Sequence, residues 1–257
     1  MSEKHNHNCI DFDDLMNNIK INIEKYGLQV IIIEATDYLP SFAYSIGLWQ
    51  KYNHPEIICF GLSTSLLHEI INDIAEIVKQ QNEKIIEKKN YSNIFEDSRS
   101  EFLKVHPENI QDYFGSAINY YGKEDFTALQ LVWTDRNDKF PWEKDFENDF
   151  LYKQPLLDRN IDFKFNEPKN LTAFTTRQWL DKEKPIIRVV HDEDGDWQFL
   201  TDDEISTENI IIVALEQLIL KDKTLNKLFD LNYGEEAERK FIGDIWMRNK
   251  IEHDNEE

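Results

Sequence analysis

The stretch "PSFAYSIGLWQKYNHPEIICFGL" (residues 40–62) decides the fold, because it carries two strand signals separated by a short polar loop. The aromatic and β-branched residues within 41–49 and 55–62 are typical of β-strands, and the preceding run "LQVIIIEA" (28–35) is typical of a buried strand. Residues 63–84 then predict a helix with one apolar stripe, made by Leu66, Ile70, Ile74, Ile77 and Val78. The region therefore predicts three neighbouring strands followed by a helix that packs on the sheet.

The sequence on either side predicts further helices and at least one more strand. Residues 12–27 have apolar residues at helical spacing and end at Gly27, residues 109–122 predict another helix, and residues 126–133 alternate like a strand. Regular alternation of strand and helix, which marks doubly wound folds, is not present. We therefore expect an α+β fold, with a mixed, partly antiparallel sheet and packed helices.

The pattern along the chain also predicts its domain organisation. Residues 1–11 form a polar tail, and residues 12–155 form the α+β domain. Residues 156–185 contain prolines and aromatic anchors, which favour an ordered connection over a disordered linker. Residues 186–257 predict a small C-terminal α+β unit, with two short helices expected within 214–249.

One acidic stretch, "RVVHDEDGDWQFL" (188–200), can be interpreted as a metal loop, a catalytic carboxylate cluster or a turn. If Gly195 is set at the sixth position of a calcium loop, Val190 falls at the first position and Thr201 at the twelfth, so both ends of the ligand set fail. The dipeptide Asp194-Gly195, flanked by strand-forming residues, is typical of a two-residue hairpin turn. We therefore expect a hairpin whose remaining acids are mostly rim charges.

The charge of the chain limits its partners. There are 29 Lys and Arg against 50 Asp and Glu, a net charge of −21. Such a surface repels phosphate backbones and anionic headgroups, so we expect neither nucleic-acid nor membrane binding, whereas a basic protein partner is favoured. The alternative is that the acidity serves solubility alone. Two cysteines, Cys9 and Cys59, and an N-terminus without an apolar leader predict a cytoplasmic protein.

Three ordered segments resemble a known family. The matching positions are Pro40, Phe42, Ala43, Tyr44, Gly47 and Leu48; Pro55 and Glu56; and Gln130, Trp133, Asp135, Phe140, Pro141 and Trp142. On these residues, roughly 10–155 of the chain resembles the bacterial family known as domain of unknown function 4262. Many members carry a glycine just before the F-P-W segment, where this chain has "RNDK" (136–139). The resemblance implies a fold and no catalytic residue.

Tyr44, His54 and Glu56 form the first group of candidate ligand-binding residues, near one connection between strands. A histidine two residues from a glutamate could orient it for acid–base chemistry. The alternative is a polar loop with an aromatic lid, and no nucleophile lies near a base in a recognised arrangement.

Trp133, Asp135 and Trp142 form the second group of candidates, and two indoles with one carboxylate could clamp a planar or cationic ligand. The alternative is that these tryptophans belong to the core and anchor loops. No glycine-rich nucleotide-binding pattern is present, and flavin binding rests on fold analogy alone. The motif "HNHNC" (5–9) offers at most three ligands, too few for a zinc site. We therefore expect no metal and no cofactor, and the sequence identifies no catalytic residue.

These observations lead to one functional hypothesis and one alternative. We expect an acidic cytoplasmic binding protein that engages a basic protein partner, with an immunity or antitoxin-like role as its sharpest form. The alternative is a small-ligand-binding protein or an enzyme, flavin-type or hydrolytic, that uses the six candidate residues in one aromatic and carboxylate pocket. The sequence leans away from an enzyme because it shows no catalytic constellation.

Overall fold

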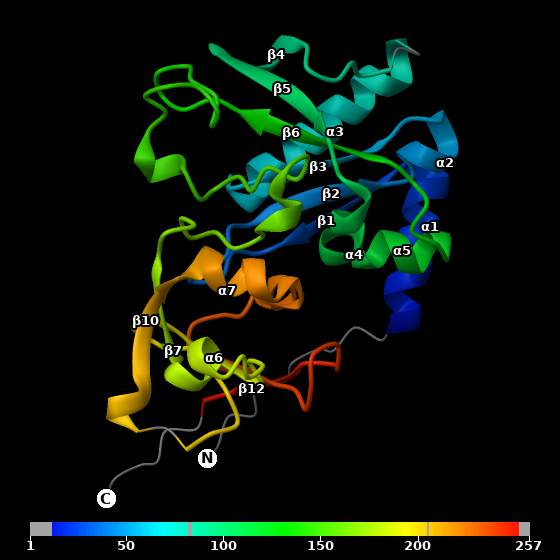
Figure 1. Cartoon of the computed structure of the whole chain (residues 1–257). Helices are drawn as coiled ribbons and strands as arrows, with labels where there is room; N and C mark the ends of the chain where they lie inside the picture. Colours follow the sequence, from blue (N-terminus) through cyan, green and yellow to red (C-terminus); the bar gives the residue numbers. More distant parts are fainter. Residues whose placement is uncertain (1–11, 82–83, 205, 252–257) are drawn as a thin grey trace, which may run out of the picture. The chain divides into compact units, whose positions relative to one another are not determined.

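The computed structural model describes residues 12–81, 84–204 and 206–251. The contacts between residues divide the chain into two compact units (Figure 1). Unit 1 comprises Met1–Glu34 and Ser41–Asp158, and unit 2 comprises Ala35–Pro40 and Arg159–Glu257. None of the described helices is both long and apolar enough to cross a membrane.

Unit 1 contains a six-stranded mixed sheet with the strand order β1-β2-β3-β6-β5-β4. Its strands are β1 (Gln29–Ile33), β2 (Phe42–Ile46), β3 (Glu56–Phe60), β4 (Asn90–Phe95), β5 (Ser98–Lys104) and β6 (Ala128–Trp133). Only β3 and β6 pair in parallel, and every other pairing is antiparallel. The predicted mixed, partly antiparallel sheet is therefore confirmed.

Helices cover both faces of this sheet. They are α1 (Phe12–Tyr26), α2 (Leu48–Tyr52), α3 (Thr64–Gln81), α4 (Ile110–Tyr113) and α5 (Gly115–Tyr121), with short 3-10 turns η1 (Pro107–Asn109) and η2 (Asn148–Phe150). On one face, α3 packs Leu67 and Ile71 against Ile57 of β3 in a single apolar cluster. On the other face, α1, α4 and α5 pack against Ile58 and its neighbours. Strand β3 is buried on both sides, as its unbroken apolar run implies.

Several local predictions for unit 1 are wrong in detail. On α3, Ile70, Ile74 and Val78 are buried as the predicted stripe requires, but Leu66 of that stripe is 37% exposed and the buried face also includes Leu67 and Ile71. The helix expected over 109–122 is interrupted at Phe114. The run 28–35 forms a strand at the sheet edge, with its last two isoleucines exposed. The position of the sheet beneath α3 decides which of its residues are buried. The spacing of apolar residues in the sequence does not give that position.

Unit 2 contains a second six-stranded sheet with the order β10-β7-β9-β8-β11-β12. Its strands are β7 (Thr172–Thr176), β8 (Arg188–His191), β9 (Trp197–Leu200), β10 (Ile210–Ala214), β11 (Glu235–Glu238) and β12 (Met247–Lys250). Its helical elements are η3 (Asn160–Asp162), α6 (Arg177–Asp181), η4 (Thr207–Asn209), α7 (Leu215–Lys221) and η5 (Lys223–Leu228). Together, the two units give the expected α+β fold.

Two segments of unit 2 differ from the sequence-based prediction. Residues 159–185, most of the expected connection, contribute β7 and α6 to the unit itself. The prediction of a second helix within 214–249 is wrong. Residues 235–238 form the strand β11 instead, which pairs with β8 and β12. The glutamates of "GEEAERK" (234–240) favour a helix locally, but pairing with β8 overrides that preference.

The hairpin predicted from the 188–200 stretch is present, with a longer turn than expected. Strands β8 and β9 pair antiparallel, and Asp192 N–H donates to Asp196 O at 3.1 Å. Asp192 Oδ1 also accepts from the N–H groups of Asp194 and Asp196. Gly195 alone has a positive φ, 88°, so the turn is a three-residue loop closed by a left-handed glycine. The Asp192 carboxylate therefore holds the turn, in agreement with the hairpin interpretation.

The loop between β1 and β2 packs within unit 2. Tyr38 Oη donates to Glu167 Oε2 at 2.9 Å, and Trp197 Nε1 donates to the other oxygen of the same carboxylate at 2.9 Å. The Tyr38 ring also contacts the His191 ring, with centroids 4.7 Å apart. Burial raises the pKa of Tyr38 above its ordinary value. Residues 35–40 are therefore an integral part of the core of unit 2.

A glycine at the start of α2 provides a test of this fold. Gly47 has φ 122°, and a Cβ there would lie 2.8 Å from Gly27 O. We expect Gly47→Ala to lower the free energy of unfolding by roughly 1–3 kcal/mol, because both strain and a clash are introduced. Urea denaturation measures the change. The control is Gly115→Ala, where no heavy atom lies within 4 Å; equal losses in the two variants would contradict the assignment.

Candidate functional site

Glu56 is fully buried at the start of β3, and its carboxylate organises the connection from β2 to α2. Ser45 Oγ donates to Oε2 at 2.5 Å and Tyr121 Oη donates to Oε1 at 2.5 Å. The N–H groups of Gly47 and Trp49 also donate to Oε1, at 3.0 and 2.9 Å. Burial raises the pKa of Glu56, and these four hydrogen bonds act in the opposite direction. The carboxylate is thus an internal anchor rather than a group presented to solvent.

His54 is also internal, at 1% exposure. Its Nδ1 lies 2.7 Å from Pro55 O, and its Nε2 lies 3.1 Å from the backbone nitrogen of Ile85. Because the Ile85 N–H can only donate, Nε2 is the acceptor and Nδ1 carries the proton. Burial lowers the pKa of His54, so the neutral ring is favoured. Both ring nitrogens are engaged in holding the chain after α3 against the α2–β3 loop.

Tyr44 completes the first predicted group, and it too is buried. Its hydroxyl accepts a hydrogen bond from Ser116 N–H at 3.2 Å, at the start of α5. Its ring lies 5.0 Å from the Phe114 ring, in the cluster that packs against α1, α4 and α5. Tyr44 therefore fixes the break between α4 and α5.

Trp133, at the end of β6, is 6% exposed. Its indole Nε1 donates to Phe60 O at 2.8 Å. The amide side chain of Gln154 bonds both the N–H and the carbonyl of Trp133, each at 3.0 Å, in the manner of a neighbouring strand. The neighbouring motif residue Gln130 holds the same segment, because its amide bonds Pro155 O at 2.8 Å and Leu157 N–H at 2.9 Å.

Asp135 shapes the loop that follows β6. Its Oδ1 accepts from Asn137 N–H and Lys139 N–H, each at 2.9 Å, and its Oδ2 accepts from Glu147 N–H at 2.8 Å. Burial acts to raise the pKa of Asp135, but these three hydrogen bonds outweigh it and hold the pKa below its ordinary value. The "RNDK" departure from the family pattern is therefore accommodated in a loop closed by one carboxylate.

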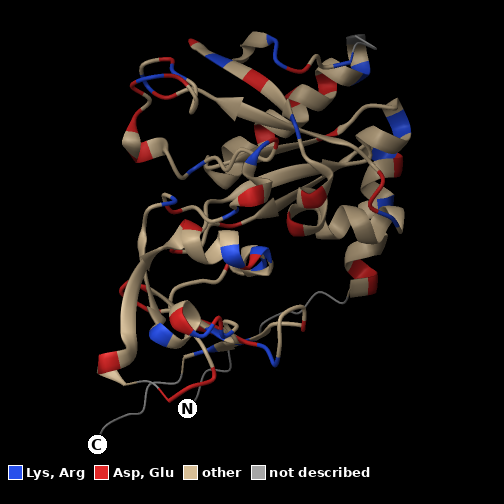
Figure 2. Ribbon diagram, in the orientation of Figure 1, with Lys and Arg blue, Asp and Glu red and all other residues tan. Residues whose placement is uncertain are grey.

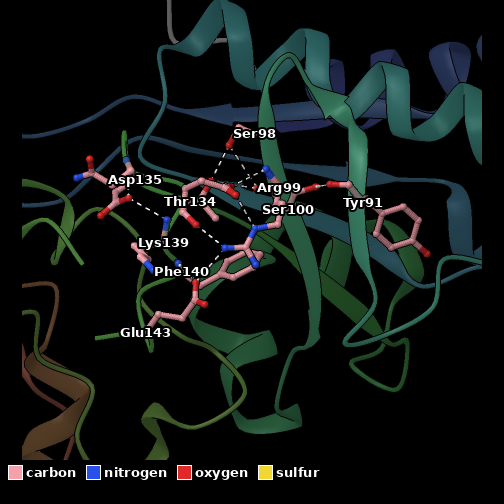
Figure 3. A network of polar contacts seen from close by, with 11 residues as sticks. Tyr91, Ser98, Arg99, Ser100, Thr134, Asp135, Lys139, Phe140 and Glu143 are labelled. Carbon is pink, nitrogen blue, oxygen red and sulfur yellow. Dashed lines mark hydrogen bonds and ion pairs between the residues drawn. The ribbon is translucent and has the colours of Figure 1, made fainter. Parts of the chain in front are cut away.

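The same loop is held to β5 by an arginine (Figure 3). Arg99 Nε donates to Asp138 Oδ2 at 2.7 Å, and Arg99 Nη2 lies 3.2 Å from Glu143 Oε2. The guanidinium carbon of Arg99 also lies 4.9 Å from the centre of the Phe140 ring. The Phe140 ring stacks on the Trp142 ring, with the ring centres 4.8 Å apart. Trp142 is the one predicted site residue that is exposed, at 38%. This network fixes the F-P-W segment at the rim of unit 1.

The structure separates Tyr44 of the first predicted group from Trp133 of the second. Tyr44 lies in the cluster on the α1, α4 and α5 face of the sheet, whereas Trp133 lies in the cluster on the α3 face. The expected single pocket lined by both groups is therefore not formed by these side chains. Ligand binding by these residues stays a prediction, and the described geometry gives their polar atoms roles in holding the fold.

An acidic hollow lies in unit 2, where sequence reasoning had placed no site. It has a volume of about 370 Å³ and contains one cation, Lys250. Its lining residues are Thr36, Asp37, Glu193, Asn232, Tyr233, Gly234, Glu235, Lys250 and Ile251. The Tyr233 ring is 41% exposed there. The sequence signal for this hollow was the acidic turn within residues 188–200. Asp37, in the β1–β2 loop, comes close to that turn only in the folded chain.

Among the described residues, no group of three or more His, Cys, Asp or Glu side chains is arranged to hold a metal ion. The histidines and cysteine of "HNHNC" (5–9) lie outside those residues. Cys59 is buried, and burial raises the pKa of its thiol to about 12, so it is not a reactive thiolate at neutral pH.

Comparison with known families supports the resemblance inferred from the motifs. Residues 22–147 match the model of the family described as a domain of unknown function (DUF4262). The matched region lies within unit 1 except for the β1–β2 loop, and it includes all three motif segments. The comparison with curated proteins gave no match. No solved structure matches the chain either.

The Glu56 anchor can be tested by an isosteric change. We expect Glu56→Gln to lower the free energy of unfolding by roughly 1–3 kcal/mol, because the amide nitrogen cannot accept the hydrogen bonds that reach the carboxylate. Glu69→Gln, at an exposed position of α3, is the matched control. Chemical denaturation of both variants measures the difference, and an unchanged Glu56→Gln protein would rule out the anchoring role.

The lowered pKa of His54 predicts that the stability of the protein depends on pH. Its pKa in the folded state lies below the ordinary value of 6.5, so the unfolded chain binds more protons as pH falls. The contribution of His54 is therefore complete above pH 6.5 and is lost as pH falls below it. We expect His54→Asn to flatten this decline in urea denaturation at a series of pH values. His68→Gln, at an exposed position of α3, should leave the decline unchanged.

Proposed function

We propose that this protein is a non-catalytic binding protein that engages a basic protein partner in the cytoplasm, in the manner of an immunity or antitoxin protein. The observation that carries the proposal is the acidic hollow of unit 2, defined above, with Asp37, Glu193 and Glu235 around the exposed ring of Tyr233. An arginine or lysine side chain of a partner fits such a site, since carboxylates pair with its charge and an aromatic ring packs on its face.

The charge of the whole chain supports the same partner. Asp and Glu exceed Lys and Arg along the chain (Figure 2), giving a net charge of −21. The turn beside the hollow adds Asp194 and Asp196, both exposed. A field of this sign speeds the encounter with a basic protein and weakens as salt is added.

The enzyme alternative gains no specific support from the described residues. The polar groups of Tyr44, Glu56 and Asp135 accept hydrogen bonds from neighbouring residues of the fold itself. A general acid or base has to reach the proton that it transfers, whereas Glu56 is fully buried. The binding proposal uses exposed residues instead.

An arginine-rich peptide tests the binding proposal directly. We expect it to bind the full chain with an affinity that falls as salt rises, and the double variant Asp37→Asn/Glu193→Gln to bind about tenfold more weakly. Isothermal titration calorimetry measures both affinities. The control, Asp73→Asn/Glu69→Gln, removes the same charge from the exposed face of α3.

Affinity purification of the full chain from its host then identifies the natural partner. A basic protein that is released by salt, and that the Asp37→Asn/Glu193→Gln chain fails to retain, supports the proposal. If the hollow variant and the control bind the peptide equally, or if binding ignores salt, the acidic hollow is not the binding site and the proposal fails.

A further inference from the structure

Strand β12 brings two basic side chains onto acidic residues of unit 2. Arg248 and Lys250 lie two positions apart, so their side chains share one face of the strand. Arg248 Nη2 donates to Asp230 Oδ1 at 2.5 Å and to Lys227 O at 2.7 Å. Lys250 faces Glu235 of β11 in the strand pairing. Strand β12 is therefore a basic strand docked beside acidic residues.

The end of β12 forms part of the wall of the acidic hollow. Lys250 and Ile251 line the hollow together with Asp37 and Glu193. Ile251 N–H donates to Gly234 O at 2.8 Å, which continues the pairing with β11 beyond the strand. The place that the proposed function gives to a basic side chain of a partner thus lies next to a basic side chain of this chain.

Strand β12 is held less firmly than the strand beneath it. All four residues of β12 are exposed, and in the described chain β11 is its one strand neighbour. Strand β11 also pairs with β8, and Glu236 of β11 binds Arg188 of β8 at 2.5 Å. Arg239, directly after β11, is buried and donates to Ile186 O at 2.8 Å. An edge strand with few buried contacts opens at low cost, so β12 can separate while β11 keeps its place.

We propose that the basic partner binds as an extended strand that takes the place of β12 on β11. The inference rests on the proposed function, because it gives a binding mode to the same partner at the same hollow. The partner strand carries two basic residues at alternate positions, in the places of Arg248 and Lys250, followed by an apolar residue in the place of Ile251. Strand addition supplies main-chain hydrogen bonds, and the alternate side chains supply specificity.

Strand β12 is then a competitor of the partner within the same chain. While it is paired, the backbone groups of β11 on that side are not available to another strand. A competitor that is covalently attached acts at a high effective concentration, so the partner binds more tightly whenever β12 is weakened. A partner that only inserts a side chain into the hollow, or that adds to the outer side of β12, does not require β12 to leave.

A disulfide between β11 and β12 tests whether β12 has to leave. Glu236 faces Asn249, and neither residue lines the hollow. Facing residues of antiparallel strands have Cα atoms about 4.5–5.5 Å apart, within the range of a disulfide. The variant is Glu236→Cys/Asn249→Cys in a Cys9→Ser chain that retains the buried Cys59.

The probes are the arginine-rich peptide and the peptide "IWMRNKI", which has the sequence of residues 245–251. We expect the reduced variant to bind both peptides, and the oxidised variant to bind them about tenfold more weakly, because β12 can no longer leave. Fluorescence anisotropy measures the affinities. The reduced and oxidised chains have the same charge, so the reduced chain is the control for the charge of the hollow.

The spacing of the two basic residues is tested with a second peptide. The sequence "IWMRKNI" has the same composition as "IWMRNKI" but places its two cations on opposite faces of an extended strand. We expect it to bind the wild-type chain about tenfold more weakly, because only one cation can then lie in the place of its counterpart in β12.

Weakening β12 should have the opposite effect to locking it. We expect Arg248→Gln/Lys250→Gln to bind the arginine-rich peptide about tenfold more tightly than the wild type. The control is Lys169→Gln/Lys182→Gln, which removes the same two charges from exposed positions of unit 2. The control shows how much of the gain comes from the greater net negative charge alone.

Two results would each overturn the inference and leave the proposed function in place. The first is equal binding of the arginine-rich peptide by the reduced and oxidised chains, which means that the partner reaches the hollow while β12 stays paired. The second is equal affinity of the wild-type chain for "IWMRNKI" and "IWMRKNI". If no form of the chain binds any of the three peptides, the proposed function fails and the inference fails with it.

Discussion

The buried carboxylate of Glu56 is the interaction on which the arrangement of unit 1 depends. It joins Ser45 at the end of β2, the first turn of α2 and Tyr121 of α5 to the start of β3. A carboxyl group taken out of water is tolerated only when its polar atoms are hydrogen-bonded, and here four donors converge on its two oxygens. Helix α5, which is distant in sequence, is thereby joined to the β2–α2–β3 connection, where the central strand β3 begins.

Two other residues of the family motifs, Gln130 and Asp135, extend the same principle along the sheet, together with Gln154, which lies outside the motifs. Gln130 and Gln154 satisfy backbone groups where the chain has no strand partner, and Asp135 closes the loop that follows β6. These side chains replace backbone pairing where the sheet gives way to irregular chain. The motifs that identify the family are therefore explained by the needs of the fold.

The sequence predicted those parts of the fold in which local preference and tertiary environment agree. The apolar runs that became β2 and β3, and the helix that follows them, are of this kind. The polar strand β4, with most of its residues at least partly exposed, gave no such signal. The glutamates of segment 235–238 favour a helix, and only the pairing with β8 makes this segment a strand. The candidate site followed the same rule, since the sequence could not show that Tyr44 and Trp133 occupy opposite faces of one sheet.

The chain passes between the two units three times, because residues 35–40 belong to unit 2 while their neighbours on both sides belong to unit 1. Tyr38 is made early in synthesis, yet the side chains that it packs against, His191 and Trp197, follow more than 150 positions later. The sheet of unit 1 can form around an open β1–β2 loop, but that loop cannot dock until the ribosome has nearly finished. A nascent chain therefore carries an unburied tyrosine through most of its translation. A fragment that starts at residue 159 would lack the ring that covers the His191–Trp197 stack.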